Sequence, residues 1–370
     1  MILTPFQGLF PKTNLIADLD SFFSTVKHNY PQFVSNGFFE KGHSEGVFLY
    51  QISTKKASHY GIISAVDIYD LLNDNILPHE KTLAAKEQEQ LQLTLDRKAF
   101  IKPVLLGFKP FKSFRVFAEN KIKTKADLIQ KLDSKNETHS FWKISTGEEV
   151  ELISIMFRRK VKKAYIADGH HRCSIARILW YQSQKEMVPF KIDSLLAVLM
   201  PFDQLTINDF NRVIELGAGF RPAYFMAALS KYFKIEQLKS KEKPKKKFQL
   251  TLFLDDNWFR LKWKKKIIKT FQKDHKVLLD YFLLNEIVLK NILKVEDVRS
   301  YQDIKYVPGP DKFKGIKKVA AEMVNPAGFM LYPITAKEIC YYSDNQMILP
   351  PKSSYFEPRV INGMIVQEIK

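Results

Sequence analysis

Short apolar runs alternate with helix-forming segments along the first half of the chain. The runs are of strand length and rich in β-branched and aromatic residues, which predicts strands over 45–53, 61–68, 102–108, 113–119, 163–167 and 193–202. Strong helix formers, capping residues or apolar positions at helical spacing predict helices over 83–99, 124–132, 148–159 and 170–184. Thr82 is a candidate N-cap for the first of these helices.

The pattern changes after about residue 205. Two alternating runs around a polar turn predict a β-hairpin over 248–263, and apolar-rich segments predict helices over 276–293 and 315–323. A Pro-broken loop and a strand follow within 350–369. This order predicts an α/β (α+β) protein with two closely packed domains, residues 1–204 and residues 205–370.

Composition narrows the class of protein. The 370 residues are 45% hydrophobic and 26% charged, which is typical of a globular protein. The N-terminus does not read as a secretory signal, and no apolar stretch approaches the roughly 20 residues of a membrane span. The two cysteines, Cys173 and Cys340, argue against a disulfide framework and a Cys-based zinc site. We therefore expect a cytoplasmic protein with no membrane partner; the sequence leaves the oligomeric state open.

The net charge of +18 is unevenly distributed. Residues 231–276 contain 16 lysines and arginines against five aspartates and glutamates. One interpretation is a surface that binds nucleic acid or another polyanion. The favoured alternative is a lysine-rich hairpin with a solvated face, because Arg260 is the only arginine and specific phosphate readout more often uses arginine.

The densest chemistry lies in YIADGHHRC, residues 165–173. A strand that ends in Asp-Gly before a helix brings free backbone N–H groups and the positive end of the helix dipole together, which favours an anion. Gly169 permits a sharp turn, Asp168 is a candidate cap, and Arg172 can bind phosphate through two hydrogen bonds. His170 and His171 add donors in the first helical turn.

Two other interpretations of this motif stay open. Adjacent histidines on a helix point about 100° apart, unlike the i, i+4 pairs of zinc motifs, and no third ligand is obvious, so a metal site is disfavoured. The motif can also be purely structural, with a capping aspartate, one packed histidine and solvated neighbours.

A second candidate site is PHEKT, residues 78–82. A glutamate such as Glu80 can act as a general base, and a neighbouring lysine such as Lys81 can neutralise phosphate charge. His79 and Thr82 are supporting candidates. The segment can equally be a solvated turn in which Thr82 caps the next helix.

These motifs together resemble one family. Their order along the chain resembles that of domain-of-unknown-function family 1015. The motifs are PHEKT, DGHHR after a strand about ninety residues later, NRVIE at 211–215 and PPKSSYFEPRVINGM near the C-terminus. That family resembles the free serine kinases of the ParB/sulfiredoxin superfamily. The resemblance implies a ParB/sulfiredoxin-like core with a mixed sheet and helices, and an added C-terminal α+β lobe.

The resemblance also implies roles for single residues. In the free serine kinases, the motif that matches Asp168, Gly169, His170, His171 and Arg172 holds the nucleotide phosphates. The glutamate that matches Glu80 deprotonates the acceptor hydroxyl, and ADP or ATP with Mg²⁺ would be the cofactors.

The C-terminal motif looks like a signature of the added lobe. Its Lys352, Ser353 and Ser354 could close on a phosphate, or its prolines could fix a structural turn. The chain departs from the family pattern after DGHHR, where it has Cys173, Ser174 and Ile175, and a retained fold with altered activity is an open alternative.

The sequence thus predicts a nucleotide-dependent phosphotransferase that acts on a small hydroxyl-bearing metabolite. The alternatives are a non-catalytic nucleotide-binding or regulatory protein and, less favoured, a nucleic-acid-binding protein that uses residues 231–276. Sulfiredoxin chemistry is disfavoured because Cys173 follows Arg172, whereas sulfiredoxins have their catalytic cysteine where this chain has His170. Neither a P-loop nor a GxGxxG motif occurs in the sequence.

Overall fold

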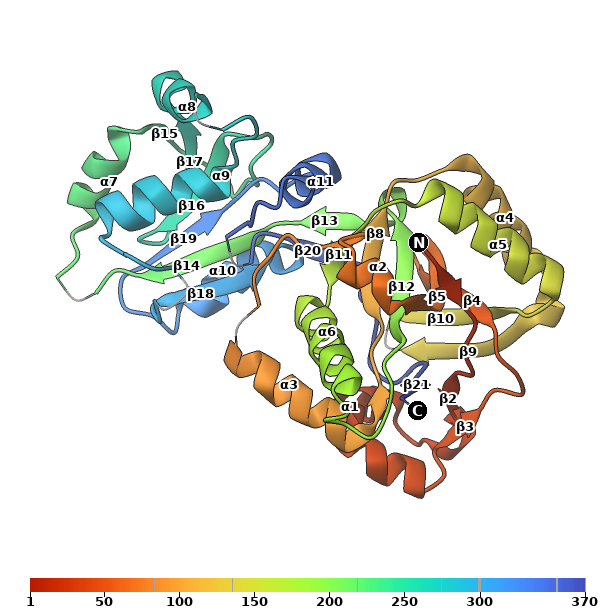
Figure 1. Ribbon diagram of the computed structural model, residues 1–370. Coiled ribbons are helices and arrows are strands. Elements are labelled where there is room, and N and C mark those ends of the chain that lie inside the picture. Colours follow the sequence, from red (N-terminus) through yellow and green to blue (C-terminus); the bar gives the residue numbers. More distant parts are fainter. Residues whose placement is uncertain are drawn as a thin grey trace. The chain divides into compact units, whose positions relative to one another are not determined.

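A computed structural model describes residues 1–82, 84–134, 136–217, 219–273, 275–298, 301–350 and 352–369. The chain divides into two compact units, Met1–Thr206 with Pro358–Lys370, and Ile207–Glu357. Both contain helices and a β-sheet, so the predicted α/β (α+β) class is confirmed (Figure 1).

The first unit is built on a large mixed sheet. Its strands are β1 (Leu3–Thr4), β4 (Val47–Thr54), β5 (Ser58–Asp67), β6 (Ile76–Leu77), β8 (Val104–Phe108), β9 (Leu128–Ser134), β10 (Glu137–Ile144), β11 (Ala164–Asp168) and β12 (Ser194–Pro201). The order is β6-β11-β8-β12-β5-β4-β10-β9, and β1 pairs with β5. β8 runs parallel to β12 but antiparallel to β11. The central strands are buried almost throughout, which explains their continuous apolar runs.

Six α-helices are described in this unit: α1 (Leu19–Ser35), α2 (Ile68–Leu72), α3 (Ala84–Arg97), α4 (Lys112–Lys123), α5 (Gly147–Lys160) and α6 (His170–Gln184). Figure 1 shows α3 beside α6, and α4 beside α5. Thr146 caps α5 by accepting a hydrogen bond from the backbone N–H of Glu149. The contact of α3 with α6 brings the helix that follows PHEKT against the helix that begins within DGHHR.

Two sequence predictions for this unit are wrong. Residues 113–119 were expected to form a strand but lie in helix α4, whose buried Phe114, Ala118 and Lys121 follow a helical period. Residues 124–132 were expected to form a helix, but a 3₁₀ turn at Lys125–Asp127 leads into strand β9, which pairs with β10. Tertiary pairing overrides local propensity in the second case.

The C-terminus returns to the first unit, whereas the sequence assigned all of 205–370 to a second domain. Strand β21 (Gln367–Glu368) pairs with β7 (Ala99–Phe100), and Val366 exchanges backbone hydrogen bonds with Leu9 on β2 (Leu9–Pro11), which pairs with β3 (Phe39–Lys41). Met364, Ile365 and Val366 are fully buried. Burial of this apolar segment favours its place in the first unit.

The second unit contains a six-stranded sheet. Its strands are β14 (Phe210–Glu215), β15 (Phe233–Gln237), β16 (Gln249–Leu254), β17 (Asn257–Trp263), β18 (Ile304–Pro308) and β19 (Pro326–Met330), in the order β15-β17-β16-β19-β14-β18. β16 and β17 form the predicted hairpin. A further pair joins β13 (Thr206–Asn208) and β20 (Tyr355–Glu357).

The helices described in this unit are α7 (Pro222–Ser230), α8 (Lys265–Gln272), α9 (Asp280–Leu283), α10 (Lys312–Ala320) and α11 (Ala336–Asp344). The long helix predicted for 276–293 is present in part: α9 continues as a π-helix over Leu284–Ile292. Across the described residues of both units, no helix has the length and apolar character needed to span a bilayer.

A cluster of aromatic rings fixes α4 and α5 on the large sheet. The ring of Phe157 on α5 lies 5.3 Å from that of Phe108 on β8 and 5.5 Å from that of Phe114 on α4, in edge-to-face geometry. All three side chains are buried to 1% exposure or less. Each such pair adds to the free energy gained by burial.

We predict that Phe157→Ala lowers the free energy of unfolding by about 3–5 kcal/mol, because it leaves a cavity among these rings. Leu152→Ala on the same helix is the matched control, since Leu152 is 51% exposed, and should change stability by less than about 0.5 kcal/mol. Urea unfolding measures both. Equal effects of the two variants would contradict this account of the core.

Candidate functional site

The DGHHR motif folds as the strand-turn-helix that the sequence predicts. Strand β11 ends at Asp168, Gly169 adopts φ +110°, and α6 begins at His170. A Cβ atom at position 169 would lie 2.6 Å from Nη2 of Arg172 and would require the guanidinium to move. The glycine therefore allows both the left-handed turn and the close approach of Arg172.

Asp168 does not cap α6, contrary to the sequence prediction. Its carboxylate accepts a hydrogen bond from Nη2 of Arg172 at 3.1 Å and pairs with Nζ of Lys102 at 3.0 Å. Burial alone would raise the pKa of Asp168, but the charges of Arg172 and Lys102 lower it well below its usual range. The carboxylate is therefore ionised at neutral pH and holds two cations beside the helix N-terminus.

His79 joins the PHEKT segment to the DGHHR motif. The rings of His79 and His170 lie 4.7 Å apart in edge-to-face geometry, and the backbone N–H of His79 donates to Nε2 of His170 at 3.4 Å. Burial lowers the pKa of His79 to about 4 and lowers that of His170 well below its usual value. Both rings are neutral at pH 7, which agrees with Nε2 of His170 acting as an acceptor.

The residues of PHEKT that follow His79 are more exposed than His79 itself. Glu80 and Thr82 are half-buried, and Lys81 is exposed. Thr82 and Ser174 hydrogen-bond the carboxylate of Glu87 on α3, and these bonds, with the nearby His171, lower the pKa of Glu87. Glu87 was not predicted as a site residue, because in the sequence it is only an acidic residue about one turn inside a predicted helix.

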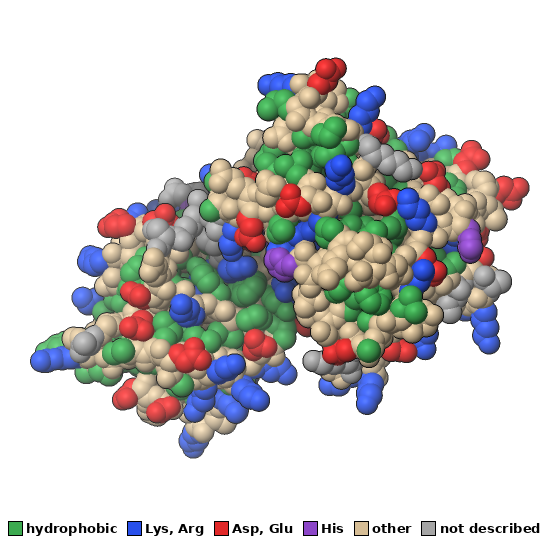
Figure 2. All heavy atoms as spheres, turned by 90° about the horizontal axis from the view of Figure 1, so that it is seen from below, with side chains coloured by type: hydrophobic (Ala, Val, Ile, Leu, Met, Phe, Trp, Pro, Cys, Tyr) green, Lys and Arg blue, Asp and Glu red, His purple; other side chains and the backbone are tan. Residues whose placement is uncertain are grey.

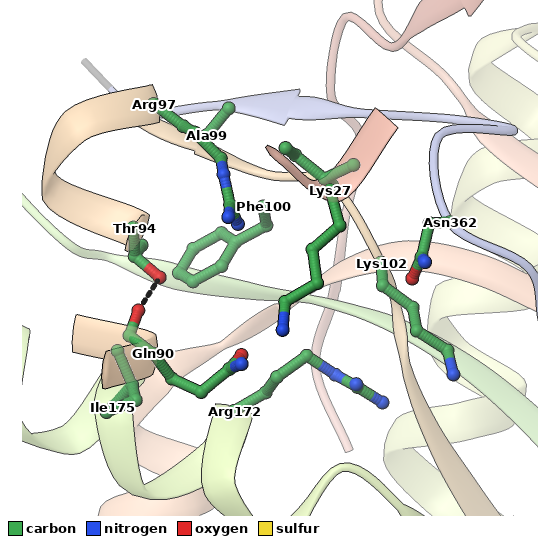
Figure 3. A pocket seen from close by; sticks show the side chains of 11 residues that line it. Lys27, Gln90, Thr94, Arg97, Ala99, Phe100, Lys102, Arg172, Ile175 and Asn362 are labelled. Carbon is green, nitrogen blue, oxygen red and sulfur yellow. Dashed lines mark hydrogen bonds between the residues drawn. The ribbon is translucent and has the colours of Figure 1, made fainter. Parts of the chain in front are cut away.

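A cavity of about 240 Å³ lies beside Arg172 in the same unit. Figure 3 shows its lining side chains, which come from α1, α3, α6, β7 and the C-terminal segment. They include Lys27, Arg97, Lys102 and Asn362. These residues were not predicted from the sequence, because single members of a set of 58 lysines and arginines have no local sequence signature.

The C-terminal candidates belong to the other unit. Ser353 is 1% exposed and donates a hydrogen bond to the carbonyl of Pro350, and Nζ of Lys352 lies 5.4 Å from the centre of the Phe210 ring. Ser354 is half-buried. These contacts favour the interpretation of this segment as a structural turn.

The basic region 231–276 carries acidic partners. Arg260 pairs with Glu236 at 3.0 Å and with Glu242 at 2.7 Å, and Lys245 pairs with Glu242 at 3.0 Å. These ion pairs favour a solvated surface for the basic region. Figure 2 shows one face of the molecule, on which cationic and acidic side chains are intermingled.

Two further sequence interpretations concern metal and thiol chemistry. Among the described residues, no group of three or more His, Cys, Asp and Glu side chains is arranged to hold a metal ion. Cys173 is buried, and burial raises the pKa of its thiol to about 12. A thiol of this kind packs and is a poor nucleophile.

A model of the DUF1015 family, described as proteins of unknown function, matches residues 10–282. The chain belongs to the DUF1015 family. No curated protein matches the chain.

Three solved structures that are similar to this DUF1015 chain share 10–13% sequence identity with it. A free serine kinase variant in complex with ADP is 13% identical and has a TM-score of 0.40; the alignment covers 84% of this chain and 94% of the kinase chain. A C-terminally truncated SbnI from Staphylococcus aureus is 10% identical, covers 81% of this chain and 85% of its own, and also has a TM-score of 0.40. A conserved hypothetical protein from Pyrococcus furiosus is 12% identical and has a TM-score of 0.37; the alignment covers 82% of this chain and 94% of that protein.

We predict that burial of neutral His79 makes the protein less stable as pH falls. The pKa of His79 is about 4 in the folded chain and about 6.5 when unfolded, so the unfolded chain binds the proton first. This loss of stability develops between about pH 6.5 and pH 4. His79→Phe should reduce the difference in unfolding free energy between about pH 7.5 and about pH 5 by about 2 kcal/mol.

Urea unfolding of wild type and variant at both pH values measures this difference. An unchanged pH dependence in the variant would show that His79 is not buried as a neutral ring.

Proposed function

We propose that the protein transfers a phosphoryl group from a nucleotide, ADP or ATP, to the hydroxyl of a small metabolite. The observation that carries this proposal is the contact of His79 with His170, because it brings two motifs 91 residues apart to one place. Phosphoryl transfer requires mainly positioning and charge neutralisation, and these two motifs supply both. The sequence resemblance to free serine kinases, and through them to a ParB/sulfiredoxin-like core, supports the same function.

The phosphates would bind at the N-terminus of α6. Gly169 is the N-cap of this helix and adds no side chain there, and the helix dipole favours negative charge. Arg172 and Lys102 would pair with phosphate oxygens while Asp168 keeps both cations in place. Nε of Arg172 is buried and has no hydrogen-bond partner among the described residues, so the protein does not satisfy every donor of this guanidinium.

Mg²⁺ would be held by the nucleotide phosphates with one or two carboxylates. Asp168 and Glu87 suit this role, because lowered pKa values keep both ionised next to the motif. When bound, the ion would neutralise phosphate charge.

Glu80 would be the general base. It follows His79 in the chain, and as a carboxylate it can accept the proton that the acceptor hydroxyl loses when its oxygen bonds to phosphorus. Neutral His79 and His170 add no positive charge that would hold this proton back. His171, Lys81 and Thr82 would support the site, His171 and Thr82 through Glu87.

The second candidate is a nucleotide-binding protein without catalysis. It is favoured by the departure from the family pattern after DGHHR, where Cys173 is buried, Ser174 bonds Glu87 and Ile175 lines the cavity. This candidate shares the phosphate site and differs only in turnover. Nucleic-acid binding is less favoured, because Arg260 is the only arginine of the basic region and it is paired with Glu236 and Glu242.

We predict that Glu80→Gln lowers nucleotide turnover by about 100-fold or more and leaves nucleotide affinity within about twofold of the wild-type value. The amide keeps the shape of the side chain and removes the base. Nucleotide hydrolysis or transfer and calorimetric titration with ADP and ATP measure the two quantities. Glu151→Gln, an exposed glutamate on α5, is the matched control and should behave as wild type.

A fully active Glu80→Gln variant would contradict the role of Glu80 as the base. Nucleotide binding with no turnover in the wild-type protein would instead favour the non-catalytic candidate.

We further predict that Gly169→Ala weakens nucleotide binding by about tenfold or more. The new Cβ would strain the left-handed turn and displace the guanidinium of Arg172. Gly147→Ala, at a glycine with open space around it, is the control and should bind normally. The same titration measures both, and unchanged affinity in Gly169→Ala would argue against a phosphate site at this turn.

A further inference from the structure

The cavity beside Arg172 is lined by cations from four segments of the chain. Lys27 comes from α1, Arg97 from the last turn of α3, Lys102 from the segment after β7 and Arg172 from α6. In Figure 3, Lys27 and Arg97 enter from the side opposite Arg172. No aspartate or glutamate is among the described residues that line it.

Carboxylates near the cavity neutralise only part of this charge. Asp168 is shared between Lys102 and Arg172, and Glu89, which is 61% exposed, lies 4.0 Å from Nζ of Lys27. Burial lowers the pKa of Lys102 and that of Arg97, although the charge of Asp168 acts against this shift at Lys102 and that of Asp96 acts against it at Arg97. The charges of Arg172 and Arg359 lower the pKa of Lys102 further. Partly buried cations in excess of their carboxylates are destabilising unless an anion joins them.

Two of the lining cations each have one buried nitrogen without a partner in the described part of the chain. Nη2 of Arg97 and Nε of Arg172 have no hydrogen-bond partner among the described residues. Buried guanidinium nitrogens are normally bonded, so each calls for an acceptor. A ligand with two acidic groups can pair with both of the guanidinium groups that line the cavity, because guanidinium groups pair well with carboxylates and phosphates.

The rest of the lining suits a compact polar molecule. Gln90, Thr94 and Asn362 offer neutral hydrogen-bonding groups, and Phe100 supplies an aromatic wall. The volume of about 240 Å³ is below the roughly 300–1,000 Å³ typical of pockets for drug-sized ligands. A whole nucleoside diphosphate is therefore a poor match for this space.

We propose that this cavity binds the acceptor, and that the acceptor is a compact hydroxyl-bearing metabolite with two or more acidic groups. The claim that the ligand is the acceptor rests on the proposed function; the claim that it is multiply acidic rests on the cavity. In the reaction, the acceptor oxygen bonds to the terminal phosphorus, the bond from phosphorus to the leaving nucleotide oxygen breaks, and the hydroxyl proton passes to Glu80.

The same cations could instead serve the phosphates of the nucleotide, so the experiment separates these two sources of acidic groups. Calorimetric titrations of the full chain use ADP alone, then 3-phosphoglycerate, citrate or L-serine with and without saturating ADP. 3-Phosphoglycerate and citrate carry a hydroxyl and several acidic groups, whereas L-serine is a hydroxyl compound with no net charge.

The variants are Arg97→Gln and Lys27→Gln, with Lys86→Gln as the matched control, because Lys86 is an exposed lysine on the same helix as Arg97. We expect 3-phosphoglycerate or citrate to bind in the presence of ADP, and L-serine to bind at least tenfold more weakly. Arg97→Gln and Lys27→Gln should each weaken the acidic ligand about tenfold or more and change ADP affinity less than about twofold. Lys86→Gln should change neither.

Three results would overturn the proposal. If the acidic ligands compete with ADP and Arg97→Gln weakens both alike, the cavity belongs to the nucleotide phosphates, and the proposed function survives without this acceptor. If L-serine binds as tightly as the acids and Arg97→Gln has no effect, the acceptor is not acidic. If neither ADP nor any of the acidic ligands binds, both the proposed function and this proposal about the acceptor fail.

Discussion

The candidate site depends on one carboxylate, that of Asp168, which forms ion pairs with two cations at once. It pairs with Lys102 at 3.0 Å and with Arg172 at 3.1 Å, across the turn that Gly169 makes possible. The pairing keeps two cations at the N-terminus of a helix that already favours anions. Without it, Lys102 and Arg172 would be partly buried charges that repel each other. The local geometry of one strand-to-helix turn therefore sets the chemistry of the cavity beside it.

A neutral pair of histidines provides the second constraint. The His79–His170 contact ties the loop that bears Glu80 to the first turn of α6, and Glu87 ties the start of α3 to the same helix through Ser174. Burial keeps both rings uncharged at neutral pH. Positive charge at the site thus comes from arginine and lysine, while the histidines serve for packing and hydrogen bonding.

The sequence predicted the parts of this site that have a local signature. The strand, Gly169 and α6 follow from spacing, and the relation of PHEKT to DGHHR came from resemblance to a family. Lys27, Arg97 and Asn362 could not be predicted, because only tertiary packing brings α1, the end of α3 and the C-terminal segment together. For the same reason α4 was misread as a strand and β9 as a helix: their aromatic and polar patterns are ambiguous until the neighbouring element is known.

A crystal structure of the full chain with bound ADP tests the central claim most directly. The account predicts phosphate oxygens within hydrogen-bonding distance of the guanidinium of Arg172 and of the backbone next to Gly169, with Lys102 as a further partner. Nucleotide density at any other place, with the turn before α6 vacant, would contradict it.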